Sequence, residues 1–243
     1  MPIELAATPP ALYNPQTQTC RDCGVRRFAL FGALDDQALA GIHHRIADVS
    51  LEPGELLFAA NQHGQAAYTL REGVVRLERA SERGARRIVR LVGRSALVGM
   101  EAMLGQTYAA DAIACTPVRA CRLPRALLDD LGSQNAELQR NLMQRWQAAV
   151  DEAEEWLTEL TAGSARWRLL RLLLKLSEFG DADGRIWLPS RQDMGAMLNM
   201  TVETASRGIA ALRRDGVLQP VDPRHARVDM PRLLERLNVA ATG

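Results

Sequence analysis

The four cysteines have the most distinctive chemistry in this sequence: Cys20, Cys23, Cys115 and Cys121. Thiolates bind zinc and iron–sulfur clusters, and in a reducing compartment cysteines are more often metal ligands, redox thiols or core residues than disulfides. Cys20 and Cys23 are separated by two residues within a polar arm, where a core role is least expected. This pair therefore predicts a metal or redox site.

A second stretch, residues 190–216, predicts two short helices joined by a tight turn. Ser190 begins the first helix with Asp193 in its first turn, as in a capping box. Asn199 can take the left-handed conformation that ends this helix, and Thr201 can cap the next one. Two short helices connected in this way form a helix-turn-helix.

The second of these helices has two distinct faces. Its apolar residues recur at helical spacing and predict an inward face: Val202, Ala205, Ile209 and Leu212. The opposite face carries Glu203, Ser206, Arg207, Ala210 and Arg214. Arginine suits guanine, a carboxylate accepts from cytosine, and a hydroxyl adapts to either, so this face predicts base contacts. A solvated polar face on an ordinary helical domain is the alternative that periodicity leaves open.

A long helix is predicted ahead of this motif, from residue 135 to residue 163. Its apolar residues repeat about every 3.5 positions, which is typical of a helix that packs along a partner. We expect this stripe to form a homodimer interface, with an intramolecular core helix as the alternative. The stripe consists of Leu138, Leu142, Trp146, Ala149 or Val150, Ala153, Leu157 and Leu160. Gly163 is expected to end the helix and Ser164 to cap the next one.

The region before the long helix predicts a β-barrel. Glycines recur at intervals of about ten residues from Gly54 to Gly105, with short apolar or alternating runs between them. Turns at this spacing are typical of an all-β barrel or sandwich. The expected fold class is α+β, with a cupin-like barrel, a dimerisation helix and a winged helix-turn-helix.

Composition agrees with a DNA-binding protein that lacks a membrane segment. The 243 residues include 30 Lys and Arg and 29 Asp and Glu; from Thr161 onward 13 of the basic residues face only 9 acidic ones. A basic C-terminal third hints at a nucleic-acid partner. No stretch approaches the roughly 20 apolar residues of a membrane span, and residues 1–19 do not resemble a signal peptide, so a cytoplasmic location is expected.

The helix-turn-helix resembles that of the CRP/FNR regulators. The matching residues begin with Arg191, Asp193, Met194 and Gly195 and end with the run Val202-Glu203-Thr204-Ala205-Ser206-Arg207, which is most similar to the FNR branch. Asn199 stands where the family usually has a turn glycine. The layout from about residue 20 to the end is also similar to that family, which makes the base-reading interpretation specific.

The resemblance implies a homodimer that binds a palindrome of the type TTGAT-N4-ATCAA and acts with RNA polymerase. By the family pattern Arg207 reads guanine, Glu203 the paired cytosine strand and Ser206 a neighbouring thymine. Arg213 and Arg214 are expected to touch phosphate. The full set of expected DNA contacts is Arg191, Thr201, Glu203, Thr204, Ser206, Arg207, Arg213 and Arg214.

The FNR resemblance extends to the cysteines and implies an oxygen-labile 4Fe–4S cluster. Cys20 and Cys23 match the start of the family's N-terminal cysteine group, and Cys121 matches its central cysteine. The third N-terminal cysteine, however, falls on Ala29. The hypothesis is a cluster held by Cys20, Cys23 and Cys121, with Cys115 or Asp22 completing the site. The alternatives are a zinc site, thiol-redox sensing, or cysteines that hold no metal.

Cyclic AMP is not expected to bind. CRP-type members hold its phosphate with an Arg-Ser pair, whereas residues 99–109 keep Glu101 but have no such pair. A buried phosphate would then lack a compensating cation. An unknown small ligand, a haem or a constitutive DNA-binding dimer stay open as alternatives. The histidines are scattered and favour no haem site: His43, His44, His63 and His225.

An enzyme is not expected, because a cupin-like metalloenzyme needs inward His and Glu ligands grouped on strands. The sequence contains no such group. The predicted domains are an arm over residues 1–27, a sensory barrel over 28–134, the dimerisation helix over 135–163 and the DNA-binding domain over 164–243.

Overall fold

The computed structural model describes Leu30 and residues 42–82, 84–132 and 135–241. The chain divides into two compact units. The first contains residues 1–75 and 93–145, and the second contains residues 76–92 and 146–243. The arm with Cys20, Asp22, Cys23 and Ala29 lies outside the described residues.

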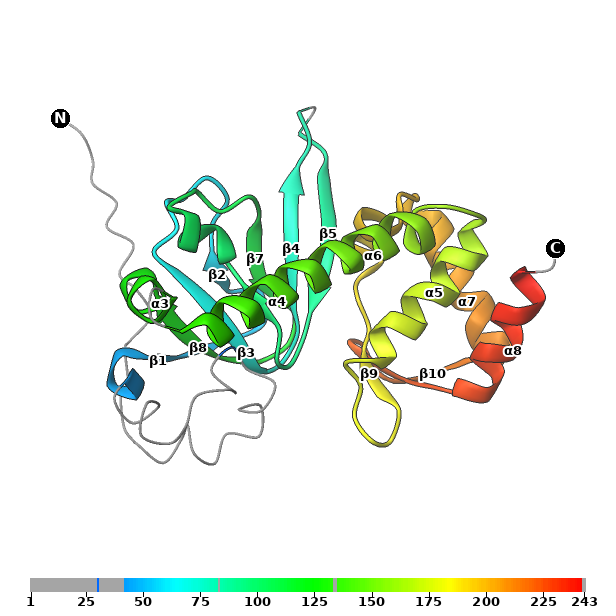
Figure 1. The fold of residues 1–243 in the computed structure, drawn as a ribbon. Coiled ribbons are helices and arrows are strands. Elements are labelled where there is room, and N and C mark those ends of the chain that lie inside the picture. The colour runs from blue at the N-terminus through cyan, green and yellow to red at the C-terminus, as the bar shows by residue number, and fades with distance from the viewer. Residues whose placement is uncertain (1–29, 31–41, 83, 133–134, 242–243) are drawn as a thin grey trace. The chain divides into compact units, whose positions relative to one another are not determined.

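The first unit is built on two antiparallel sheets, which confirms the expected N-terminal β domain (Figure 1). Short strands between glycine turns form both sheets, as the glycine spacing predicts. One sheet has the order β1 (Ala47–Leu51), β8 (Val118–Pro124), β3 (Ala66–Glu72) and β6 (Leu97–Val98). In the other, β2 (Leu56–Phe58) pairs with β7 (Asp111–Ala114).

Helical segments cover one face of the β1-β8-β3-β6 sheet. The cluster there joins Leu123 of β8 to Leu127 and Leu128 of α3 (Arg125–Gly132) and to Leu138 of α4 (Ala136–Glu155). Leu30 is fully buried in the same cluster. The sequence did not predict α3. The described part of this unit also contains two short 3-10 helices, η2 (His43–Arg45) and η3 (Met100–Leu104).

The predicted long helix is α4, which continues as a π-helical turn, η4 (Trp156–Leu160). Gly163 follows with φ of +77°, and the Ser164 side chain accepts a hydrogen bond from the amide of Trp167. The Ser164 cap is therefore confirmed, whereas the long helix ends at Leu160 with Thr161 as its C-cap, ahead of the expected Gly163. Among the described residues, no helix is long and apolar enough to cross a membrane.

The second unit contains the helix-turn-helix and its wing. Helices α5 (Ala165–Ser177), α6 (Arg191–Leu198) and α7 (Val202–Arg214) pack on one another, and the wing is a sheet of order β10-β11-β9. The unit also includes the β-hairpin β4–β5. It ends with a C-terminal helix, α8, which the sequence did not predict. The bounds are β4 Val75–Ala80, β5 Arg86–Val92, β9 Arg185–Trp187, β10 Leu218–Asp222, β11 His225–Val228 and α8 Met230–Ala241.

Candidate nucleic-acid interface and cysteine site

Three side chains hold the geometry of the two-helix motif. The Ser190 hydroxyl accepts from the amide of Asp193 (3.0 Å) and Thr201 accepts from the amide of Thr204 (3.2 Å). Asn199 has φ and ψ of 52°, the left-handed conformation that ends α6. These are the caps that the sequence predicts, and they set the turn between α6 and α7.

Arg168 of α5 stabilises this turn through hydrogen bonds to its backbone. The sequence analysis did not predict this role. One of its guanidinium nitrogens, Nη1, donates to the backbone carbonyls of Leu198 and Asn199, the latter at 3.2 Å. Cations suit the C-terminal carbonyls of a helix because of the helix dipole. No local pattern points to Arg168, because its partners lie about 30 residues away in the chain.

The recognition helix α7 presents a polar face to its surroundings and buries the other. Ala205, Ile209 and Leu212 are buried, while the expected base-reading residues Ser206 and Arg207 are exposed. The remaining exposed positions are Thr201, Val202, Glu203, Ala210, Arg213 and Arg214, and Thr204 is half-buried.

Val202 corrects the predicted inward face. Its side chain is 45% exposed at the start of α7, on the same surface as Glu203. The residue spacing assigned it to the core because the predicted period was extended one turn too far toward the N-terminus. An exposed valine beside polar residues suits contact with a thymine methyl group.

Charged groups of both signs lie on and around α7. Hydrogen bonds from its own amide and from Thr201, together with the charge of Arg207, lower the pKa of Glu203, so it is ionised. Burial and the nearby charge of Arg213 lower the pKa of Arg191. The second effect shows that Arg191, at the start of α6, shares a positive region with Arg213.

The long helix carries an exposed apolar stripe that differs from the predicted one at both ends. Leu138 is buried and Leu142 half-buried against the chain's own core, and Leu160 is buried as well. The exposed positions follow steps of three and four residues, as in a heptad pattern. They are Met143 (73% exposed), Trp146, Val150, Ala153 and Leu157 (65% exposed).

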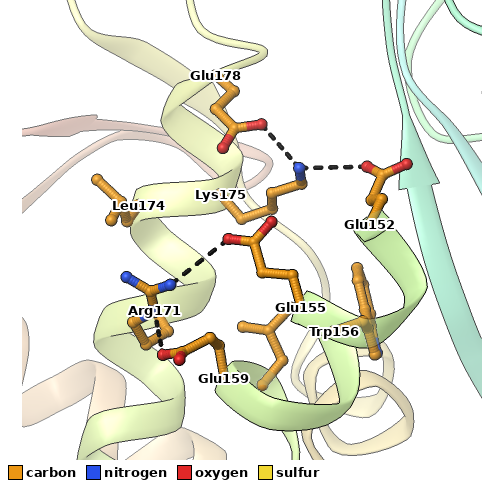
Figure 2. Close-up of a pocket in the computed structure, with 9 residues that line it drawn as sticks. Glu152, Glu155, Trp156, Glu159, Arg171, Leu174, Lys175 and Glu178 are labelled. Atoms are coloured by element: carbon orange, nitrogen blue, oxygen red, sulfur yellow. Dashed lines mark hydrogen bonds and ion pairs between the residues drawn. The ribbon is translucent and has the colours of Figure 1, made fainter. Parts of the chain in front are cut away.

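Ion pairs join the end of this helix to α5, where nine residues line a small pocket (Figure 2). Lys175 lies between Glu152 (3.2 Å) and Glu178 (2.8 Å), and Arg171 pairs with Glu159 at 2.9 Å. Burial lowers the pKa of Lys175, but the two carboxylates outweigh this effect and raise it. Ion pairs between side chains that line the pocket thus connect the predicted dimerisation helix to α5.

The two described cysteines lie in different settings, Cys121 on a strand and Cys115 in the segment that follows one. Cys121 of β8 is opposite Asp48 and Thr69 in the register, so the three side chains share a sheet face. This face packs against Leu30, seven residues after Cys23. Cys115 is buried just after β7, and its amide donates to Val74. Within the described part of the chain, no three His, Cys, Asp or Glu side chains form a metal-binding group.

The first unit also holds a buried group of aromatic rings. Phe58 stacks on Tyr108 with centroids 4.0 Å apart and on Tyr68 at 5.8 Å, and the Tyr108 hydroxyl donates to the carbonyl of Ala66 at 2.7 Å. The Glu101 carboxylate accepts from the amide of Ala109 at 3.2 Å. Tyr108 and Glu101 thus each form a hydrogen bond within the first unit.

Two family models match the chain. The cyclic nucleotide-binding domain matches residues 48–135, and the Crp-like helix-turn-helix domain matches residues 168–237. The first range covers most of the described β domain with α3, and the second covers the helix-turn-helix, the wing and most of α8.

The chain is similar over most of its length to known regulators. A probable transcriptional activator of Rhizobium leguminosarum bv. viciae is 30% identical over 90% of this chain and 92% of its own. The transcriptional activator protein FnrL of Cereibacter sphaeroides is 29% identical over 89% of this chain and 90% of its own.

Solved structures agree with these relatives. A CRP/FNR-family transcriptional regulator from Thermus thermophilus has a TM-score of 0.64 and 28% identity, over 79% of this chain and 99% of that one. FixK2 from Bradyrhizobium japonicum has a TM-score of 0.70 at 23% identity, over 78% and 96%. With the exposed recognition helix and the two matched domains, these similarities identify the chain as a member of the CRP/FNR family, a DNA-binding transcription regulator and not an enzyme.

Proposed function

We propose that the protein binds, as a homodimer, a palindrome of the type TTGAT-N4-ATCAA and acts there with RNA polymerase. The observation that carries this proposal is the exposed row on α7, in which an ionised Glu203, a hydroxyl at Ser206 and a guanidinium at Arg207 lie on one face. A carboxylate acceptor, a hydroxyl and a bidentate guanidinium donor are groups that distinguish the base edges in the major groove.

Each exposed group has a base partner in this proposal. Arg207 donates to guanine O6 and N7, Glu203 accepts from the cytosine N4 amino group, and Ser206 contacts a neighbouring thymine. Thr201, Thr204, Arg191, Arg213 and Arg214 contact the phosphates, which orient the helix in the groove.

The dimer forms through the exposed stripe of α4. The positions Met143, Trp146, Val150, Ala153 and Leu157 repeat with the spacing of a coiled-coil seam. An exposed apolar stripe of this length needs a partner in water. A palindrome has the two-fold symmetry of such a dimer, so each half-site receives one α7.

The signal is oxygen or redox state, received by an iron–sulfur cluster on Cys20, Cys23 and Cys121. The position of Leu30 supports this set, because Leu30, seven residues after Cys23 in the sequence, is buried in the cluster against which Cys121 packs. Asp48, opposite Cys121 in the register, pairs with Arg71 at 3.0 Å, so its negative charge beside the thiolate is balanced. When bound, the cluster supplies a redox-sensitive link between the arm and β8.

Of the two candidates for the fourth ligand, Cys115 and Asp22, Cys115 lies in a different sheet setting from Cys121. A strand rises about 3.3 Å per residue, so Cys121 lies about 10 Å along β8 from its first residue, Val118. Cys115 precedes the turn before Val118 and is buried at the end of a strand in the other sheet. Cyclic AMP is not the signal in this proposal, since the segment from Glu101 to Ala109 has no cation for its phosphate.

The test of DNA recognition is the affinity of the full-length protein for a duplex that carries the palindrome, compared with a scrambled duplex of equal length. We expect at least about a thousandfold preference at physiological salt. Equal affinity for both duplexes would reject the palindrome, although DNA binding as such would stand.

The test of the signal is the visible spectrum of protein purified without oxygen, together with iron, sulfide and zinc analysis. We expect a broad absorbance near ~400 nm that bleaches in air, with iron and sulfide present. Stoichiometric zinc in a colourless protein would replace the cluster with a structural thiolate site. A colourless protein without metal that still binds the palindrome would leave a thiol switch or a small ligand as the signal.

A further inference from the structure

The hairpin β4–β5 contacts the first helix of the DNA-binding motif through two consecutive arginines. Arg86 Nη2 lies 2.8 Å from Asp193 Oδ1, and its Nε lies 2.6 Å from Glu78 Oε1. Arg87 Nη1 donates to Asn199 Oδ1 at 2.7 Å. The hairpin and the motif belong to the same compact unit, and β5 packs directly against α6.

The Arg86 contact involves a buried carboxylate. Asp193 is only 7% exposed, and it also accepts a hydrogen bond from the Ser190 hydroxyl at 2.7 Å. Burial alone raises the pKa of Asp193, but hydrogen bonds from Ser190 and Arg86 and the charges of Arg76 and Arg86 outweigh it and lower the pKa. Asp193 is therefore an ion whose charge is balanced mainly from the hairpin.

The Arg87 contact involves the residue that forms the turn. Asn199 has left-handed backbone angles, which glycine adopts at lower cost. The asparagine side chain instead provides an acceptor that glycine lacks, and Arg87 uses it. Arg168 donates to the backbone carbonyl of the same residue. Arginines from two separate elements thus hold the turn between α6 and α7.

We propose that Arg86 and Arg87 are positioning residues for DNA recognition, and that the hairpin β4–β5 is a structural part of the DNA-binding unit. Arg86 holds Asp193 in the first turn of α6, and Arg87 holds Asn199 in the turn that follows α6. These two positions set the angle between α6 and α7. The base-reading residues Glu203, Ser206 and Arg207 stay exposed. The hairpin therefore orients the recognition helix without covering it.

The DNA-affinity part of the test rests on the proposed palindrome. The experiment therefore also measures amide hydrogen exchange in the protein without DNA. The variants are Arg86→Ala, Arg87→Ala, Asn199→Gly and the double variant Arg87→Ala/Asn199→Gly. Arg86→Lys is the conservative replacement, and Arg79→Ala, exposed on the same hairpin, is the matched control. Each full-length protein is measured for affinity to the palindromic and the scrambled duplex, and for amide hydrogen exchange over α6 and the turn.

We expect Arg86→Ala and Arg87→Ala each to weaken binding to the palindrome by about tenfold, while affinity for the scrambled duplex stays near that of the wild type. Asn199→Gly should match Arg87→Ala, and the double variant should be no worse than either, because all three remove one hydrogen bond. Arg86→Lys should recover most of the affinity, and Arg79→Ala should change nothing. Exchange over residues 191–201 should become faster in Arg86→Ala, Arg87→Ala, Asn199→Gly and the double variant, and should stay unchanged in the control Arg79→Ala.

The inference is overturned if the alanine variants bind the palindrome as well as the wild type, or more tightly, as an inhibitory contact would require. Unchanged hydrogen exchange over α6 and the turn overturns it in the same way. If the wild type does not prefer the palindrome, the proposed DNA site fails, and hydrogen exchange alone decides whether the arginines hold the motif.

Discussion

At the scale of single residues, DNA recognition depends on a few exposed side chains whose chemistry differs from position to position. Arg207 and Arg214 lie on the same helix and have the same charge, yet they occupy different places relative to the expected groove. The N-terminal end of a recognition helix reaches base edges, whereas more distant cations touch phosphate.

Arg207→Ala should therefore cost about 1–3 kcal/mol of specific binding free energy and relax the preference at one base pair in each half-site. Arg214→Ala should weaken palindromic and scrambled duplexes alike and reduce the slope of affinity against salt by about one. The measurement is a salt titration of both variants on duplexes substituted at each position. Equal losses on both duplexes for Arg207→Ala would reject its base-reading role.

Asp193 leads to a prediction about pH. Its pKa is lowered in the folded protein, so its ion pair stabilises the fold above the unfolded value of about 3.9 and this contribution disappears as the pH falls through the folded value. Asp193→Asn should cost about 1.5–3 kcal/mol at pH 7, because it removes a hydrogen bond between charged groups. Urea unfolding should show this difference in full at pH 7, and the difference should shrink progressively as the pH falls below about 3.9 toward the lower folded pKa of Asp193. A difference independent of pH would show that the charge of Asp193 is not what stabilises the fold.

At the scale of elements, the turn of the helix-turn-helix tolerates little added volume. A Cβ on Gly195 would lie 2.7 Å from the backbone carbonyl oxygen of Met200, so the turn could not keep its present path. A Cβ on Gly208 would instead meet a methyl group of Leu169, a buried side chain of α5 rather than the backbone of the turn. The two glycines are both helical, which makes them a matched pair.

We expect Gly195→Ala to destabilise the protein by about 1–3 kcal/mol and to weaken palindrome binding, despite the better helix propensity of alanine. Gly208→Ala should also destabilise the protein by about 1–3 kcal/mol, because the buried Leu169 must repack, but it should affect palindrome binding less because it leaves the turn in place. Urea unfolding and DNA affinity measure both effects. A Gly195→Ala protein as stable as the wild type would show that the turn can relax.

At the scale of the whole molecule, the decisive surface is the apolar stripe of α4. Ala153 is the fourth of the five exposed positions from Met143 to Leu157. An acidic residue at this position would place two like charges in the seam and oppose dimer formation. An alanine removes that repulsion, so the dimer should persist without any cofactor.

Sedimentation of metal-free protein at micromolar concentration should therefore show a dimer. Ala153→Asp should weaken the dimer by at least about tenfold, since it places two like charges in the seam. Gln144→Asp, exposed on the same helix but outside the stripe, is the control. A monomeric wild type would contradict the prediction that this stripe is the dimer interface. Equal loss of dimer affinity in Ala153→Asp and Gln144→Asp would contradict it as well.

Several features could be predicted from the sequence because they depend on neighbours in the chain. The caps at Ser190 and Thr201 and the left-handed conformations of Asn199 and Gly163 all follow from local hydrogen bonding and backbone sterics. The exposed Ser206 and Arg207 follow from the 3.6-residue period.

Other features depend on residues that only the fold brings together. Periodicity could not separate the part of the α4 stripe that packs on the chain's own core, such as Leu138, from the part left exposed, such as Leu157, because both have the same spacing. Arg86 meets Asp193 across 107 positions and Arg168 meets Asn199 across 31. Helix capping and residue type are local properties and can be inferred from sequence, whereas burial and long-range charge pairing are properties of the packed chain.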